Sequence, residues 1–231
     1  MDIYREHIRQ NVVNGMDYGH LLEESFEYAK EGLVGKWVKW VLLLVATILL
    51  SLPLLGYELK ILRGEKPSPE VSDWGTLFVD GIKYAVILFV YCIPLIIIGF
   101  FSITPLIVAM ISRNPAAILA AVGAAFVGLV VFVIVAIIIA LLACFGVIRF
   151  ARTGSMGEAF NFSAILATIG RIGWLSYILA LIVLIIILCI VEVVCSLIPY
   201  VGQLLLFLLT PFIVIFEARY MCQLYDSAGT V

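Results

Sequence analysis

The chain has 231 residues, of which 64% are hydrophobic and only 13% are charged, whereas about a quarter of the residues in soluble globular domains are charged. This composition excludes an ordinary soluble domain and indicates an integral membrane protein. The long apolar stretches are continuous rather than alternating, which excludes a membrane β-barrel and favours helices. The net charge of −2 gives no general basic field, so we expect no nucleic-acid partner.

The N-terminal segment is polar and charged, and it lacks the short apolar core and small-residue cleavage site of a signal peptide. We therefore expect a polar N-terminal extension at residues 1–19 and a single integral membrane domain at residues 20–231. Insertion into the membrane is then expected to depend on the internal apolar segments.

Five apolar runs follow, and each is a candidate membrane helix because a crossing needs about 20 apolar residues. The fold class we predict is all-α: a polytopic helical membrane protein with four or five spans, interfacial amphipathic helices, and a first segment that either crosses or re-enters. The runs occupy residues 37–62, 82–111, 116–148, 174–198 and 201–216.

The first run decides between four and five spans, because Pro53 interrupts it and basic residues follow it. A single crossing by residues 37–55 places six Lys and Arg residues on one side and eight on the other. A re-entrant segment broken near Pro53 places 13 on one side and leaves only Arg113 on the other. Since cytoplasmic loops are rich in Lys and Arg, the second count is more decisive. It predicts four spans in the cytoplasmic membrane with both termini in the cytoplasm, whereas a single crossing separates the termini.

Three polar segments beside the apolar runs have helical periodicity and similar residues, so we expect them to be related interfacial helices. In the third segment, Ser155 and Glu158 have the spacing of a capping box. The expected apolar positions are Leu22, Phe26, Ala29 and Leu33 in the first segment, and Trp74, Leu77, Phe78, Gly81 and Ile82 in the second.

A recurring pattern lies between the first two runs: a Gly-Tyr pair, then Arg-Gly, Pro-Glu, a Trp and Phe-x-x-Gly-x-Lys. In this chain its residues are Gly56, Tyr57, Arg63, Gly64, Pro69, Glu70, Trp74, Phe78, Gly81 and Lys83. On this pattern the chain resembles a prokaryotic, largely archaeal family of multi-pass membrane proteins of unknown function. The resemblance covers most of the chain from about residue 24 onward. It implies a membrane location and no established activity.

Glu192 interrupts the fourth apolar run, and a charged side chain inside a membrane is costly enough to suggest a function. It follows Trp174 by about 27 Å along a helix with a rise of 1.5 Å per residue, which places it near the far interface. Two interpretations remain open: Glu192 pairs with Arg113 in a short turn on that side, or it binds a proton or a cation. Glu192 and Arg113 are therefore the candidate intramembrane polar pair.

A stripe of small residues in the third run is a candidate helix-packing seam, because small residues let helix backbones approach closely in lipid. A contact within one chain and a seam between identical chains both remain open. The stripe consists of Ala116, Ala120, Ala124 and Gly128.

Four prolines are candidate hinges, because a proline inside a helix removes a backbone hydrogen bond and frees a carbonyl. Thr104 and Thr210 precede two of them and are placed to compensate for the freed groups. The candidate hinges are Pro53, Pro94, Pro105 and Pro211.

The sequence contains no phosphate loop and no Ser/His/Asp arrangement, so we expect no enzyme activity, no catalytic residues and no cofactor. His20, Glu23 and Glu24 fit a solvated helix face better than a metal site, so no metal is expected either.

Two function classes remain. The first is a scaffold or assembly subunit of a membrane complex, whose partners are the lipid bilayer and either another membrane protein or a second copy. The second is a small, homo-oligomeric channel or transporter. The apolar runs carry few polar side chains, and a hydrophilic pathway normally needs a polar lining, so the first class is favoured.

Overall fold

The computed structural model describes residues 16–229, so almost all of the predicted extension at residues 1–19 lies outside the described residues. Within this range the chain forms eight α-helices and one 3₁₀ turn and has no β-strand, which confirms the all-α class. The elements are α2 (Tyr18–Leu33), α3 (Trp37–Ile48), α4 (Leu52–Leu62), α5 (Trp74–Ser112), α6 (Pro115–Thr153), the 3₁₀ turn η1 (Met156–Phe160), α7 (Phe162–Ile172), α8 (Trp174–Ser196) and α9 (Gly202–Asp226).

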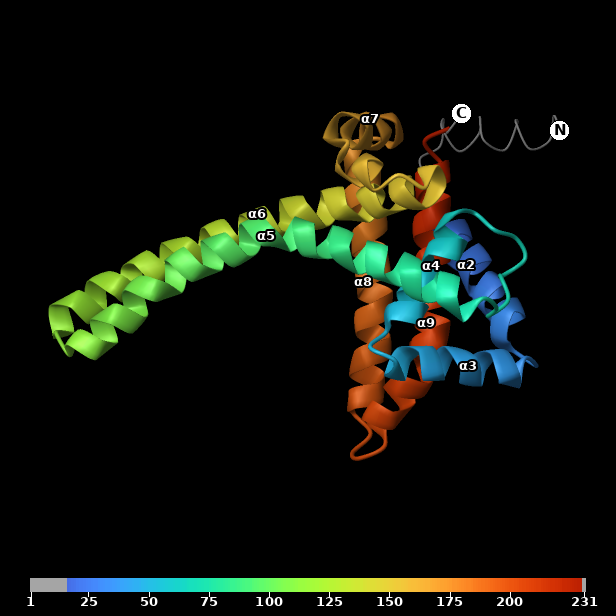
Figure 1. The fold of residues 1–231 in the computed structure, drawn as a ribbon, viewed down its shortest axis with the longest axis horizontal. Helices are drawn as coiled ribbons and strands as arrows, with labels where there is room; N and C mark the ends of the chain where they lie inside the picture. Colours follow the sequence, from blue (N-terminus) through green and yellow to red (C-terminus); the bar gives the residue numbers. More distant parts are fainter. Residues whose placement is uncertain (1–15, 230–231) are drawn as a thin grey trace.

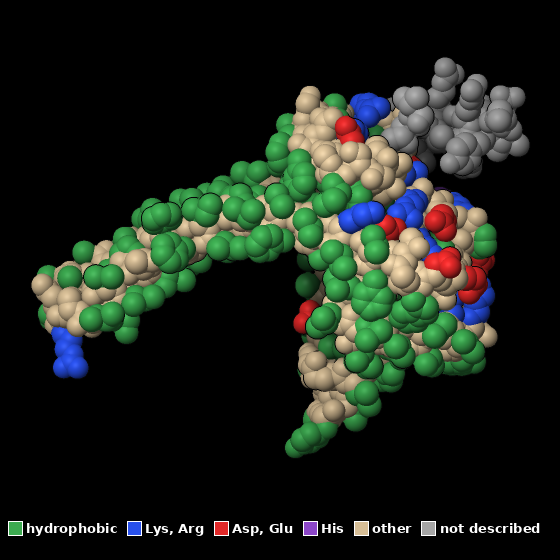
Figure 2. Space-filling view, viewed as in Figure 1, with side chains coloured by type: hydrophobic (Ala, Val, Ile, Leu, Met, Phe, Trp, Pro, Cys, Tyr) green, Lys and Arg blue, Asp and Glu red, His purple; other side chains and the backbone are tan. Residues whose placement is uncertain are grey.

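Helices α5 and α6 are each 39 residues long and form a hairpin that projects sideways from the rest of the molecule (Figure 1). Helices α8 and α9 lie side by side across the direction of this hairpin, and α2, α3 and α4 pack around α9. We call residues 92–138 the arm and the other described residues the body. Hydrophobic side chains cover the arm, charged side chains gather on the body, and a single basic side chain lies at the tip of the arm (Figure 2).

Four helices of the described chain, α5, α6, α8 and α9, are long and apolar enough to cross a membrane. The first apolar run is not among them, because it is divided into two helices of 12 and 11 residues, α3 and α4. The division falls at Leu50 and Ser51, whose φ angles of 57° and 58° lie in the left-handed region. Pro53 lies in the first turn of α4, where its missing N–H costs nothing. The structure therefore contains no continuous helix over residues 37–55.

Two glycines of the pattern Gly56 to Lys83 let α4 and α5 cross in direct backbone contact. A Cβ atom on Gly56 would lie 2.0 Å from the carbonyl oxygen of Leu77, and one on Gly81 would lie 1.8 Å from that of Leu52. Any side chain at either position would thus collide with backbone atoms of the other helix. The close crossing positions Arg63, after α4, to form an ion pair with Asp80 of α5.

The expected faces of the interfacial segments are correct only in part. In α2, Ala29 and Leu33 are buried as expected, but Phe26 is 49% exposed. The α5 segment is not a separate interfacial helix, because it continues into a membrane-length helix and buries Asp80 from its expected polar side. The prediction assigned these faces from hydrophobicity alone. It therefore missed that Asp80 is buried in an ion pair and that the aromatic ring of Phe26 is exposed.

The expected capping box at Ser155 and Glu158 is wrong. Ser155 makes no side-chain capping bond, and the Glu158 carboxylate instead accepts a hydrogen bond from Arg149 of α6. The N-cap of α7 is Asn161, whose side-chain oxygen accepts from the Ala164 N–H at 3.2 Å. Glu158 is therefore used for a contact between elements rather than for a local helix start.

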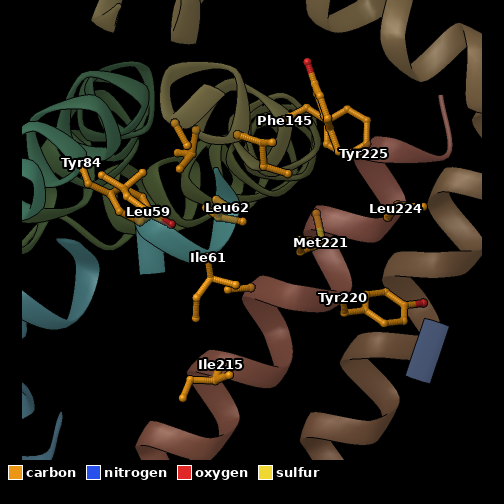
Figure 3. Close-up of a cluster of buried hydrophobic side chains, with 14 of the residues drawn as sticks. Leu59, Ile61, Leu62, Tyr84, Phe145, Ile215, Tyr220, Met221, Leu224 and Tyr225 are labelled. Atoms are coloured by element: carbon orange, nitrogen blue, oxygen red, sulfur yellow. The ribbon is translucent and has the colours of Figure 1, made fainter. Parts of the chain in front are cut away.

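The hydrophobic core lies in the body, between α4, α9 and the body ends of α5 and α6 (Figure 3). Two buried tyrosines connect helices, because each donates its hydroxyl hydrogen to a backbone carbonyl of a neighbouring helix. Tyr177 of α8 donates to Leu141 of α6 at 2.7 Å, and Tyr220 of α9 donates to Ala180 of α8 at 2.9 Å. The labelled core residues are Leu59, Ile61, Leu62, Tyr84, Phe145, Ile215, Tyr220, Met221, Leu224 and Tyr225.

Candidate functional site

The structure does not bring Glu192 and Arg113 together. Arg113 is exposed at the tip of the arm, where it ends α5, while Glu192 is exposed on α8 in the body. No ion pair joins them among residues 16–229, and the ion pairs found in that range involve other residues. The sequence argument assumed that the two far turns lie side by side, whereas the hairpins α5–α6 and α8–α9 point in different directions (Figure 1).

The small-residue stripe of α6 has two faces. Gly128 packs against α5, where a Cβ atom would lie 2.2 Å from the Ser102 hydroxyl, and Ala121 is 6% exposed. Ala116, Ala120 and Ala124 are exposed. The contact within the chain therefore uses Gly128 and the flanking position 121, and most of the predicted seam remains on the outer surface of the arm.

Three of the four candidate hinges lie inside helices: Pro94 and Pro105 in α5, and Pro211 in α9. The expected compensation by threonines is not made. A proline frees the carbonyl four residues before it, whereas Thr104 donates to Phe100 at 2.6 Å and Thr210 donates to Leu206 at 3.0 Å, one residue earlier in each case.

Pro53 differs from the other three, because it begins a helix instead of interrupting one. Beside the proline of α9, the Trp40 indole donates to the Leu208 carbonyl at 2.9 Å. A side chain of α3 thus contacts the backbone of α9 close to Pro211.

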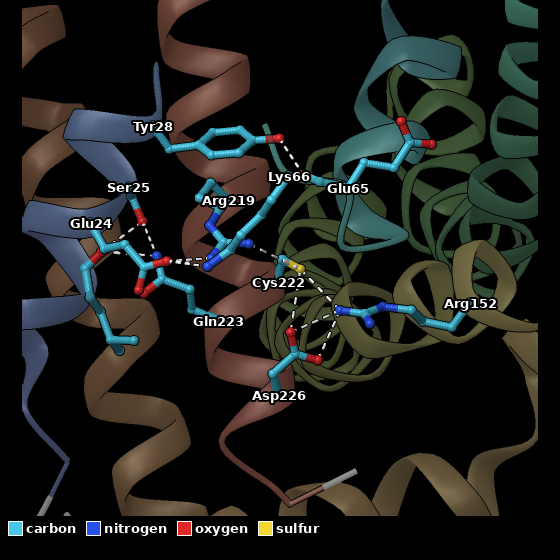
Figure 4. A network of polar contacts seen from close by, with 11 residues as sticks. Glu24, Ser25, Tyr28, Glu65, Lys66, Arg152, Arg219, Cys222, Gln223 and Asp226 are labelled. Atoms are coloured by element: carbon cyan, nitrogen blue, oxygen red, sulfur yellow. Dashed lines mark hydrogen bonds and ion pairs between the residues drawn. The ribbon is translucent and has the colours of Figure 1, made fainter. Parts of the chain in front are cut away.

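A buried ion pair that the sequence analysis missed connects α2 to α9 (Figure 4). Arg219 of α9 is only 3% exposed, and its guanidinium donates to the Glu24 carboxylate. Its Cζ atom lies 5.1 Å from the centroid of the Tyr28 ring. Glu24 also accepts from Lys66 at 2.7 Å. A buried charge needs such partners, so the packing of α2 on α9 depends on this cluster.

Neutral hydrogen bonds and a second ion pair extend the cluster. The Gln223 amide of α9 donates to Ser25 of α2 at 2.7 Å. Arg152 of α6 donates to the Leu62 carbonyl at 2.8 Å and to both oxygens of Asp226 at 2.8 and 2.9 Å. We call the cluster around Arg219 and Arg152 the polar network. Its hydrogen bonds and ion pairs connect α2, α4, α6 and α9 at one end of the body.

The charges of the polar network control the ionisation of Glu24. Partial burial alone would raise the pKa of this carboxyl, but the hydrogen bonds and positive charges of Lys66 and Arg219 outweigh it and hold the pKa below its ordinary value of 4.5. Glu24 therefore remains ionised at neutral pH. Its sequence separation of 195 residues from Arg219 explains why no local pattern revealed the pair.

A second carboxyl group inside the body also escaped the sequence analysis. Glu58 of α4 accepts a hydrogen bond from the Tyr84 hydroxyl of α5 at 3.0 Å. Burial, together with the nearby negative charge of Glu217 of α9, raises the pKa of Glu58 to about 8. Glu58 and Glu217 each follow apolar residues near the end of an apolar run. That position was the sequence signal from which the two carboxyl groups could have been identified. Among residues 16–229, no group of three or more His, Cys, Asp and Glu side chains is arranged to hold a metal ion.

Together, the four membrane-length helices and the absence of strands in the described range define the class as a polytopic helical membrane protein. The family model described as "Protein of unknown function (DUF4013)" matches residues 40–200. The chain belongs to this family, in agreement with the resemblance to a family of unknown function, and the match contains the whole pattern from Gly56 to Lys83. No curated protein and no solved structure matches the chain.

Proposed function

We propose that the protein is a non-enzymatic scaffold or assembly subunit of a membrane complex, and that its arm binds a transmembrane helix of another membrane protein. The arm carries this proposal. At 1.5 Å per residue, α5 and α6 are about 58 Å long, compared with about 30 Å for the hydrocarbon thickness of a bilayer. The most apolar part of α6 has a mean hydropathy of 3.4 and no buried residue.

The outer surface of the arm has the residues that helix contacts in lipid require. Ala116, Ala120 and Ala124 form an exposed small-residue stripe, and at 100° per residue this stripe lies beside, not on, the contact with α5. A hollow of about 320 Å³ lined by Gly99, Gly128 and Phe132, among others, adds an indentation next to it. A partner helix that approaches this surface closely makes van der Waals contacts that lipid chains make less well.

The proposal also covers the membrane topology of the chain. We infer that α3 and α4 form a re-entrant segment, that four helices cross the cytoplasmic membrane, and that both termini are cytoplasmic. The short lengths of α3 and α4 and the break at Ser51 support this topology. A cysteine introduced at Lys60 is expected to react with a membrane-impermeant reagent from the same side as one at Glu23. Labelling from opposite sides would contradict the re-entrant segment.

The scaffold function is tested by a photo-crosslinking residue at Ala120 in the full chain expressed in its membrane. We expect one discrete adduct with a different protein, and a much weaker one from Phe126, which is 66% exposed on another side of α6. Ala124→Leu should weaken the Ala120 adduct because it fills the stripe, whereas Val122→Leu, on the opposite side, should not. Equal crosslinking from both positions, or none, would overturn the scaffold proposal.

The alternative is a small homo-oligomeric channel or transporter, and Glu58 with Glu217 is the observation that favours it. Two carboxyl groups near each other inside a body of membrane helices fit a proton or cation pathway. An Ala120 adduct with twice the mass of the chain, together with an oligomeric mass in detergent that Ala120→Leu reduces, would favour this alternative over the scaffold.

A further inference from the structure

A pocket of about 500 Å³ lies where the turn between α2 and α3 meets the loop between α4 and α5. Two lysines from the start of α3, Lys36 and Lys39, line one wall, and Glu70 from the loop lines the other. Trp37 lies between the lysines in sequence and also lines the pocket. Positive charge and an aromatic side chain thus meet at one concave site outside the polar network.

Lys39 is a buried cation without a carboxylate partner. It is only 4% exposed, and within residues 16–229 no carboxylate oxygen lies within 4.0 Å of its ammonium group. Its Nζ donates to the carbonyl and hydroxyl oxygens of Ser68 at 3.2 and 3.1 Å and lies 5.8 Å from the centroid of the Tyr57 ring. An ammonium group has three donors, and Ser68 accepts from two of those of Lys39.

The burial of Lys39 disfavours the charged form of its side chain. Burial lowers the pKa of this ammonium to about 8; the charge of Glu70 opposes the shift, and the charge of Lys36 adds to it. Burying a charge without a counter-ion is unfavourable. An anion in the pocket would supply the missing counter-charge and stabilise the protonated lysine.

The backbone at the pocket adds to the positive field. Lys36 is the N-cap of α3 and makes no side-chain capping bond. The first N–H groups of a helix have no partners within the helix, and the helix dipole places partial positive charge at this end. The first turn of α3 is therefore suited to an anion, and the two lysines reinforce it.

The outer face of α3 places this pocket beside lipid. Lys39, Leu43 and Ala46 are buried, and the opposite side of the helix is apolar and exposed. Trp37 is 70% exposed and stacks on Trp40, with ring centroids 5.9 Å apart. Tryptophans favour the headgroup level of a membrane. The other exposed apolar residues of this face are Val38, Val41, Val45 and Ile48.

We propose that this pocket binds the phosphate group of an anionic phospholipid, held by Lys36, Lys39 and the first turn of α3. The phosphate lies at the depth where Trp37 places the pocket, and the acyl chains follow the apolar face of α3. Glu70 disfavours a second negative charge and can accept a hydrogen bond from a headgroup hydroxyl. The pocket therefore selects a singly charged phosphodiester with a hydroxylated headgroup over a phosphomonoester.

The test uses the full chain purified in an uncharged detergent, with thermal unfolding measured during titration with phosphatidylglycerol, phosphatidylcholine or inorganic phosphate. We expect phosphatidylglycerol to stabilise the wild-type chain more than phosphatidylcholine does. Lys39→Met should weaken its apparent binding about tenfold or more, since hydrogen bonds to ions are strong. Lys36→Gln should weaken it about fivefold. Lys30→Gln, which removes an exposed lysine of α2 outside the pocket, should leave binding unchanged.

The choice of variants lets the experiment give a clear result even if one variant does not fold. If Lys39→Met does not fold, Lys36→Gln still reports on the pocket, because Lys36 is exposed and removing its charge leaves no buried partner. Stabilisation by inorganic phosphate alone, lost in Lys36→Gln, would support the phosphate site and assign it to a free anion instead of a lipid. Equal stabilisation of the wild type, Lys36→Gln and Lys30→Gln by phosphatidylglycerol would overturn the proposed pocket.

Discussion

The arm and the body both carry hydrophobic side chains on the outside, but the contacts inside the two regions differ. The most apolar stretch of α6, a helix that runs from the arm into the body, has a mean hydropathy of 3.4 and is 0% buried, while that of α9, which lies entirely in the body, has a mean hydropathy of 1.8 and is 39% buried. Every ion pair of the described chain lies in the body. The arm has one charged residue, Arg113, and the contact between its helices uses small and apolar side chains.

This difference shows which residues specify a membrane fold. Lipid is as apolar as the side chains it surrounds, so hydrophobicity does not distinguish a surface that faces lipid from one that faces protein. Glycines against a backbone and buried ion pairs make that distinction, because they are of use only where the chain contacts itself. The body has both features, while the arm has only a small-residue contact.

The largest expected effect comes from comparing a substituted glycine in the body with a substituted glycine in the arm. Gly81→Leu should prevent accumulation of folded protein, because even its Cβ atom would lie 1.8 Å from the Leu52 carbonyl oxygen, and overpacking against backbone cannot relax easily. Gly123→Leu in the arm is the matched control, since nothing lies within 4 Å of a Cβ atom there. Monodisperse yield after detergent extraction measures both. Equal yields of the two variants would contradict the backbone contact of α4 and α5.

The second prediction compares the body and the arm by replacing one arginine in each region. Arg219→Met removes the buried partner of Glu24; because Glu24 is 34% exposed and keeps Lys66 as a partner, the expected loss is about 1–2 kcal/mol, below the about 3–5 kcal/mol typical of a fully buried pair. Arg113→Met at the tip of the arm should change the free energy of unfolding by less than about 0.5 kcal/mol. Denaturant unfolding in mixed micelles measures both changes, and a similar loss in the two variants would show that the polar network does not hold the body.

The sequence predicted the elements of this fold better than their contacts. Continuous apolar runs gave α5, α6, α8 and α9, and Pro53 with the basic residues after it indicated the break between α3 and α4. The contacts depend on residues far apart in the chain, such as Arg219 and Glu24, and no local period reveals such pairs.

The candidate site was harder to predict for the same reason. Glu192 was conspicuous because apolar residues surround it, yet the structure leaves it exposed. Lys39 entered the prediction only as one of the six Lys and Arg residues counted on one side of a single crossing, although its spacing of four from Leu43 and seven from Ala46 places it on the buried face of α3. Helical register, applied to charged residues as well as apolar ones, was the signal that would have found it.

The smallest expected effect is a pH dependence that belongs to the body alone. The pKa of Glu24 is held below 4.5 in the folded chain, so the folded state binds this proton less readily than the unfolded state. The contribution of Glu24 to stability is therefore complete above about pH 4.5 and is lost as the pH falls through the lower, folded-state pKa. Because its side chain is 34% exposed, we expect a loss of about 1 kcal/mol or less.

Unfolding temperatures measured between pH 7 and pH 3.5 test this dependence. Glu24→Gln should be less stable than the wild type at pH 7, and the difference should shrink as the medium is acidified, because the wild-type carboxyl then becomes neutral as well. Glu23→Gln, at the neighbouring exposed position of α2, should follow the wild-type curve throughout. A constant difference between Glu24→Gln and the wild type would mean that Glu24 contributes through packing, and that charge does not fasten α2 to α9.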